Sequence, residues 1–239
     1  MSENPQKIDV QSNFKKVLQQ VEDYSEKVGR NPSEITIVGV SKRIEFDRIK
    51  LAIDAGLEII GEIAGTELKK KLPLITDYSS STQMHIVGKM QSNKVKYAVE
   101  NCNLIQSIQT EKIFSLINRR AQSREIKYPI FIQVDFSNSV FPKGLDMNTL
   151  LKFIKSVEKY SNVEIQGIMT IAPLEYEVDQ IKLRKFFSRT HKYFIEKIVP
   201  LLDVEKPQLS MGMSNDFNVA IEEGSTMIRV GTAIFGPRN

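Results

Sequence analysis

The sequence predicts an α/β protein, specifically a single closed (β/α)8 barrel of the TIM type, and three observations support this. Short β-branched apolar segments recur along the chain and are typical of strands buried on both faces. Amphipathic stretches with helical spacing separate them, which indicates parallel βαβ units. Eight such strands are expected within 239 residues, which suits one such barrel. An open doubly wound sheet is the alternative architecture.

The expected strands are residues 35–42, 57–61, 84–88, 104–107, 129–136, 163–170, 208–211 and 226–230. The expected helices are residues 14–28, 46–53, 64–72, 94–100, 110–124, 148–160, 179–198 and 215–223. Gly29 and Pro32 end the first helix, and Pro73 ends the third, because proline cannot continue the hydrogen-bond pattern. We see no linker rich in proline, glycine or serine, so we expect residues 1–239 to form one domain.

The composition is ordinary for a globular protein, with 41% hydrophobic and 26% charged residues. No apolar stretch approaches membrane-spanning length, and the N-terminus lacks the apolar core of a signal peptide. The single cysteine, Cys102, excludes an intrachain disulfide. These features predict a cytoplasmic protein. Cys102 and the two histidines form no pattern of metal ligands, so we expect no metal.

The net charge of +4 is compatible with anionic ligands. Residues 89–127 hold eight Lys or Arg and three Glu, which leaves this stretch at +5. Such a face can contact nucleic acid, and weaker binding after changing Arg119, Arg120 and Arg124 to Ala would indicate it. No aromatic or glycine motif is interleaved with the basic residues, which favours a solvated surface instead.

Lys42 ends the first expected strand, 35–42 (ITIVGVSK). In (β/α)8 barrels the carboxyl ends of the strands carry the chemistry. Partial burial there favours the neutral amine of a lysine, the form that attacks an aldehyde to make a Schiff base. Taken alone, this residue is more typical of a lysine that reaches into water.

Two late stretches predict a phosphate site. In residues 210–216 (SMGMSND), Gly212 allows the backbone to turn or to approach a ligand closely, and Ser214 and Asn215 can cap the helix that follows. In residues 228–236 (IRVGTAIFG), Arg229 can bind a phosphate, and Gly231 and Thr232 offer N–H groups and a hydroxyl. Both stretches follow the last two strands, where such barrels often bind phosphate.

A lysine and a phosphate site at one end of a barrel describe a binding site for a phosphorylated aldehyde. Pyridoxal 5'-phosphate is the leading candidate, because proteins hold it through a lysine Schiff base. A lysine-dependent aldolase acting on a sugar phosphate uses the same parts. It would need a carboxylate near Lys42, and Glu62 is the candidate.

Several separated motifs resemble the pyridoxal-phosphate homeostasis family, a family of single-domain barrels once labelled proline-synthetase co-transcribed homologues. The motifs are residues 35–42, 85–94 (HIVGKMQSNK), 210–216 and 224–236 (GSTMIRVGTAIFG). The resemblance runs from about residue 8 to the C-terminus. It implies a fold similar to the N-terminal domain of alanine racemase.

The resemblance also implies that Lys42 carries the cofactor. The resemblance likewise implies that the residues around the phosphate of the cofactor are Met213, Ser214, Arg229, Gly231 and Thr232. One position departs from the family pattern, in which a Gly-Glu-Asn segment follows the second strand. This chain has Ile63 in place of the asparagine, which leaves only apolar packing near the cofactor ring.

The resemblance favours a non-catalytic carrier or regulator that exchanges pyridoxal phosphate with the free pool or with apo-enzymes. A racemase needs a second acid/base group opposite the lysine, and in two-domain racemases another subunit supplies it. At 239 residues, the chain is expected to have no room for such a domain beside the barrel. A weak amino-acid racemase, or another pyridoxal-phosphate enzyme, is the alternative.

Three other residues have side chains that could take either a functional or a structural role. His85 is expected either to approach the cofactor or to be a hydrogen-bonded structural histidine. Met169, near the end of a strand, is expected to fill the core. Cys102 has no sequence context that lowers its pKa, so we expect no redox role.

Overall fold

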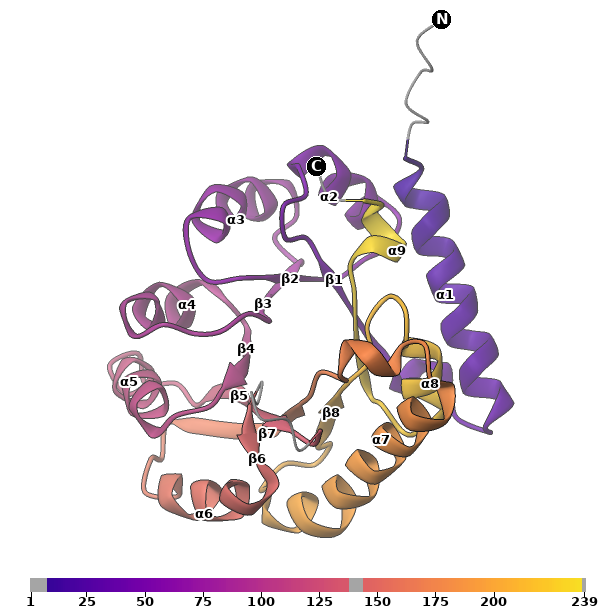
Figure 1. Cartoon of the computed structure of the whole chain (residues 1–239). Helices are drawn as coiled ribbons and strands as arrows, with labels where there is room; N and C mark the ends of the chain where they lie inside the picture. Colours follow the sequence, from indigo (N-terminus) through magenta and orange to yellow (C-terminus); the bar gives the residue numbers. More distant parts are fainter. Residues whose placement is uncertain (1–7, 138–143, 238–239) are drawn as a thin grey trace, which may run out of the picture.

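Eight parallel strands form a closed ring in a computed structural model that describes residues 8–137 and 144–237. Each strand pairs in parallel with the next, and β1 also pairs with β9, so the ring closes and the open sheet is excluded (Figure 1). The eight strands of the ring are β1 (Thr36–Val40), β2 (Ile59–Glu62), β3 (Gln83–Ile86), β4 (Leu104–Ile108), β5 (Tyr128–Asp135), β7 (Val163–Met169), β8 (Gln208–Ser210) and β9 (Met227–Val230). This confirms the predicted barrel, with strand ends shifted by up to two residues.

A helix follows each strand of the ring and packs on its outside, as Figure 1 shows. The α-helices are α1 (Val10–Lys27), α2 (Phe46–Asp54), α3 (Thr66–Tyr78), α4 (Val95–Asn101), α5 (Glu111–Gln122), α6 (Met147–Val157), α7 (Gln180–Tyr193), α8 (Phe217–Glu222) and α9 (Thr232–Phe235). Helix α1 precedes the first strand and packs against α8 and α9 (Figure 1). The amino-terminal helix therefore covers the place where the ring closes. No helix among the described residues is long and apolar enough to cross a membrane.

Several predicted helix ends are wrong, and the two largest differences are at the ends of α3 and α7. Helix α3 continues through Pro73 to Tyr78. Proline removes one backbone hydrogen bond, but Leu72 and Ile75 on either side of it are buried, and their packing maintains the helix. The helix predicted over 179–198 ends as α7 at Tyr193, and residues 194–198 form a π-helical turn.

Two short elements have no counterpart in the prediction. Strand β6 (Leu145–Asp146) pairs with the end of β5, beside the ring. Helix α9 follows β9 directly and is four residues long. Segments of two and four residues are too short to show a periodicity, so hydrophobic pattern alone does not reveal them.

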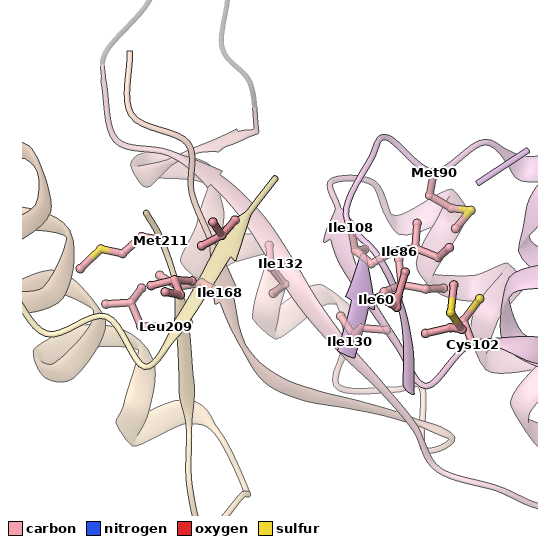
Figure 2. Packing of buried hydrophobic residues seen from close by; sticks show 14 of the residues in the cluster. Ile60, Ile86, Met90, Cys102, Ile108, Ile130, Ile132, Ile168, Leu209 and Met211 are labelled. Carbon is pink, nitrogen blue, oxygen red and sulfur yellow. The ribbon is translucent and has the colours of Figure 1, made fainter. Parts of the chain in front are cut away.

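The strands alternate between two hydrophobic clusters, because successive side chains of a strand point to opposite faces. Ile130 and Ile132 belong to the larger cluster, which also contains residues of the helices (Figure 2). Phe131, which lies between them in the sequence, belongs to the smaller cluster. The smaller cluster consists of Val38, Ile59, Leu104, Phe131, Met169 and Met227. Met169 is thus a core residue, as predicted. Burying each such side chain contributes about 1.5–3 kcal/mol, so the ring is a firm support for the loops that follow its strands.

Candidate cofactor site

A cavity of about 560 Å³ lies at the carboxyl ends of the strands, within the range of small-molecule sites. Its lining comes from segments far apart in the sequence, at or just after the ends of six strands. The lining residues are Val40, Lys42, Ile63, Val87, Gly88, Ile171, Leu174, Glu177, Met213, Ser214, Asn215, Arg229, Gly231 and Thr232. All six residues predicted to bind the cofactor therefore share one cavity.

Lys42 lies two residues beyond the end of β1, in a turn, and is half-buried. The Ser41 N–H donates to the Gly61 carbonyl at 3.0 Å, which continues the pairing of β1 with β2 past the strand end. The Ile44 N–H then donates back to the Ser41 carbonyl at 2.9 Å and closes the turn. The lysine is thus held by backbone that is fixed on both sides.

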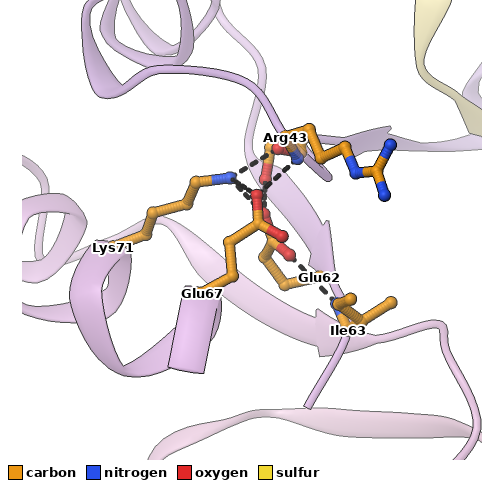
Figure 3. Close-up of polar contacts among 6 residues, drawn as sticks. Arg43, Glu62, Ile63, Glu67 and Lys71 are labelled. Atoms are coloured by element: carbon orange, nitrogen blue, oxygen red, sulfur yellow. Dashed lines mark hydrogen bonds and ion pairs between the residues drawn. The ribbon is translucent and has the colours of Figure 1, made fainter. Parts of the chain in front are cut away.

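Glu62 lies beside this turn but is not part of the cavity lining. Its side chain is fully buried, and Oε1 accepts hydrogen bonds from the Ser41 hydroxyl at 2.7 Å and from Lys71 Nζ at 2.6 Å. Oε2 accepts from the Ile63 N–H at 3.0 Å, as Figure 3 shows. This carboxylate is occupied by structural bonds, which argues against the aldolase alternative.

Ser214 connects two stretches that the sequence analysis treated separately. It does not cap the following helix, because the N-cap of α8 is Asp216 and Asn215 also precedes the cap. Instead, Ser214 Oγ accepts the Gly231 N–H at 3.1 Å and the Ala233 N–H at 3.2 Å. The hydroxyl keeps its own proton, which it can donate to an anion in the cavity. Because the Gly231 and Ala233 N–H groups already bond to Ser214, the hydroxyl proton is the donor that this arrangement offers to a phosphate oxygen.

Gly212 allows this loop to approach α8 closely. Its φ is +95°, and a Cβ at this position would lie 2.6 Å from the Ala220 Cβ and 2.9 Å from the Phe217 Cα. Its carbonyl accepts the Arg229 N–H at 3.0 Å, which ties the loop after β8 to β9. Gly212 therefore makes the predicted turn, and its close approach is to helix α8; a close approach to a ligand stays a prediction.

Arg229 places a buried positive charge at the cavity. Its guanidinium donates to Ser210 Oγ at 2.7 Å and to the Thr170 carbonyl at 2.8 Å. Burial lowers the pKa of Arg229 to about 10, and the negative charge of Asp216 opposes the shift. The residue therefore stays charged at neutral pH and favours an anionic or electron-rich ligand.

His85 belongs to a hydrogen-bonded chain inside the barrel. Ser210 Oγ donates to Gln106 Oε1 at 2.8 Å, and Gln106 Nε2 lies 3.1 Å from His85 Nδ1. Arg229 can only donate, so the Ser210 hydroxyl accepts from Arg229 and donates its own proton to Gln106 Oε1. Gln106 Nε2 then donates to His85 Nδ1. Because Nδ1 accepts a hydrogen bond, the imidazole of His85 is neutral. Burial lowers the pKa of His85 to about 4. His85 lines a different cavity, which it shares with Gln83, so it is structural with respect to the cofactor site.

Ile63 forms part of the apolar wall. At Gly88, which faces it, an added Cβ would lie 2.4 Å from Ile63 Cγ2, so glycine makes room for this isoleucine.

Cys102 is buried, and its burial raises the pKa of the thiol to about 12. Such a thiol is an inert core group.

The sequence analysis missed the segment after β7. Ile171, Leu174 and Glu177 line the cavity, and Glu177 Oε2 accepts a hydrogen bond from Asn215 Nδ2 at 2.9 Å. No motif marks these residues. Their position directly after a barrel strand was the available signal, because such loops meet at the same face.

In the part of the chain that the structure describes, no group of three or more His, Cys, Asp or Glu is arranged to hold a metal ion.

Comparisons with known proteins agree with this barrel and its cavity. Residues 65–239 match the family model of the alanine racemase N-terminal domain. An alanine racemase structure from Clostridium difficile has a TM-score of 0.70 at 15% identity, and the match covers 95% of this chain and 57% of the racemase. At that identity the likeness shows the fold alone.

Closer relatives are similar over nearly their whole length. The pyridoxal phosphate homeostasis protein of Aquifex aeolicus is 31% identical over 93% of this chain and 96% of that protein. The structure of PipY from Synechococcus elongatus with pyridoxal phosphate bound has a TM-score of 0.77 at 30% identity, covering 91% of this chain and 100% of PipY. The chain belongs to the family of pyridoxal phosphate homeostasis proteins, whose barrel is that of the alanine racemase N-terminal domain.

Proposed function

We propose that this protein binds pyridoxal 5'-phosphate and takes part in its intracellular homeostasis, holding the cofactor on Lys42. The observation that carries the proposal is that Lys42 and the phosphate-binding candidates Ser214, Gly231 and Thr232 line one cavity. Relatives of similar length are pyridoxal phosphate homeostasis proteins, and PipY has been solved with this cofactor.

The residues present suit the two ends of the cofactor. Ser214 and Thr232 would bind the phosphate through hydroxyl and N–H groups, Gly231 would hold Ser214 in place through its N–H, Arg229 would supply positive charge and Met213 would pack beside them. When bound, pyridoxal phosphate would be held as a Schiff base between its aldehyde carbon and Lys42 Nζ, formed with loss of one water. Ile63, Val87 and Ile171 offer apolar contacts to a ring lying between the two ends.

We further propose that the protein is a carrier or regulator with no robust catalysis, located in the cytoplasm. The names of its relatives support this role. In this role the protein would release the cofactor to the free pool or to apo-enzymes. The alternative, a pyridoxal-phosphate enzyme such as a weak racemase, is favoured by the alanine racemase-like fold.

Visible absorption of the purified protein tests the proposal. After free pyridoxal phosphate is removed by desalting, we expect a yellow band that stays with the protein, and loss of that band in Lys42→Ala, because the variant lacks the amine assigned to the Schiff base. A band of unchanged intensity in Lys42→Ala would contradict the assignment of Lys42. Racemisation of amino acids by the loaded protein, at rates comparable to known racemases, would replace the carrier role with the enzymatic one.

A further inference from the structure

The backbone on each side of Lys42 is bonded to helix α3. Before Lys42, the Ser41 carbonyl accepts a hydrogen bond from Lys71 Nζ at 2.6 Å. After it, the Arg43 N–H donates to Glu67 Oε1. Figure 3 shows the Lys71 and Glu67 side chains converging on this turn from the same helix. Two side chains one helical turn apart therefore hold the peptide groups that flank the lysine.

Lys71 has no bonding capacity left for another role. An ammonium has three donors, and Lys71 Nζ contacts Ser41 O at 2.6 Å, Glu62 Oε1 at 2.6 Å and Glu67 Oε1 at 2.7 Å. Both Lys71 and Glu62 are buried. Such a fully bonded, buried group has one arrangement, which makes it a rigid anchor.

Glu67 is the more accessible member of this cluster. Burial alone would raise the pKa of its carboxyl, but hydrogen bonds from Lys71 and the Arg43 N–H, with the positive charges of Lys71 and Lys42, lower the pKa below its usual value. The carboxylate therefore remains an acceptor for the Arg43 N–H. Arg43 has a φ of +58°, which is uncommon for a residue with a side chain, and this bond helps to hold it there.

We propose that Glu67 and Lys71 are positioning residues that fix the turn Ser41–Arg43 so that Lys42 meets the aldehyde of the bound cofactor. Neither residue lines the cavity, so they act through the backbone. The inference rests on the proposed function of Lys42. It predicts an effect on the covalent link and none on phosphate binding, whereas a merely structural role would affect both.

Two ligands separate these effects. Pyridoxal 5'-phosphate can form the Schiff base, whereas pyridoxine 5'-phosphate carries an alcohol in place of the aldehyde and can use only the non-covalent contacts. The ratio of their affinities in the full-length protein measures the link to Lys42. Lys42→Ala should abolish the preference for the aldehyde.

Glu67→Ala is the main variant, because it leaves Lys71 paired with Glu62. We expect it to reduce the aldehyde preference about tenfold, the worth of one hydrogen bond to a charged group. Its affinity for pyridoxine 5'-phosphate should stay within about twofold of the natural protein. Glu111→Ala is the matched control, since Glu111 is also in the first turn of a helix and pairs with Lys159 at 2.6 Å. It should change neither affinity.

Two conservative variants keep the test decisive if Glu67→Ala folds poorly. Glu67→Gln retains an oxygen for the Arg43 N–H and should keep most of the preference, whereas Glu67→Asp withdraws the oxygen by one methylene and should lose it. An unchanged ratio in Glu67→Asp, or equal loss of both affinities, would overturn the inference. A natural protein that does not distinguish the two ligands would instead refute the Schiff base on Lys42.

Discussion

Acid should destabilise this protein through His85. The buried imidazole has a pKa lowered to about 4 in the folded chain, from 6.5 as its ordinary value. Between these two pH values the unfolded chain binds a proton at this residue and the folded chain does not, so acid favours unfolding. The difference corresponds to about 3 kcal/mol in the free energy of unfolding, fully lost once the pH reaches the folded-state pKa.

The assay is urea unfolding of the cofactor-free protein between pH 7 and pH 4.5, compared with His85→Asn. Asparagine offers an oxygen to Gln106 and does not titrate. His191 and the carboxyl groups are common to both proteins and cancel in the comparison. The natural protein should lose about 2–3 kcal/mol more stability than the variant over this range. Equal losses would show that His85 is not held neutral by burial and by the chain from Arg229.

Two other substitutions test the site and its support. Arg229→Ala should weaken retention of pyridoxal phosphate by about 1.5–3 kcal/mol, the value of a hydrogen bond to a charged group, measured by equilibrium dialysis; unchanged affinity would mean that Arg229 does not contribute to cofactor binding. Gly212→Ala should lower the melting temperature more than Gly29→Ala, because both have positive φ but only the Cβ at residue 212 would collide with α8. The reverse order in calorimetry would contradict the close approach of that loop.

Much of the barrel was predictable because its strands are short, β-branched and separated by amphipathic helices. Lys42, Ser214 and Arg229 follow or occupy strands whose ends meet at one face, so their convergence on one cavity follows from topology. Pro73 shows where local rules fail, since packing on either side maintains a helix that proline would end.

The bonds that shape the site were not predictable, because they join distant residues through side-chain geometry. Ser214 was expected to cap the helix next to it, yet it bonds to N–H groups of Gly231 and Ala233 beyond the following strand. The contact of Lys71 with the Ser41 carbonyl crosses 30 positions of the sequence. Periodicity reports which face of an element is buried, but it does not report such partners.

The central claim is that Lys42 holds the aldehyde of pyridoxal phosphate. Borohydride reduces a Schiff base to a stable secondary amine, so the attachment can be located by mass spectrometry of peptides from the reduced protein. We expect the reduced cofactor on Lys42, and its loss from that peptide in Lys42→Ala. A reduced cofactor found mainly on another lysine of the natural protein, or on none, would contradict it.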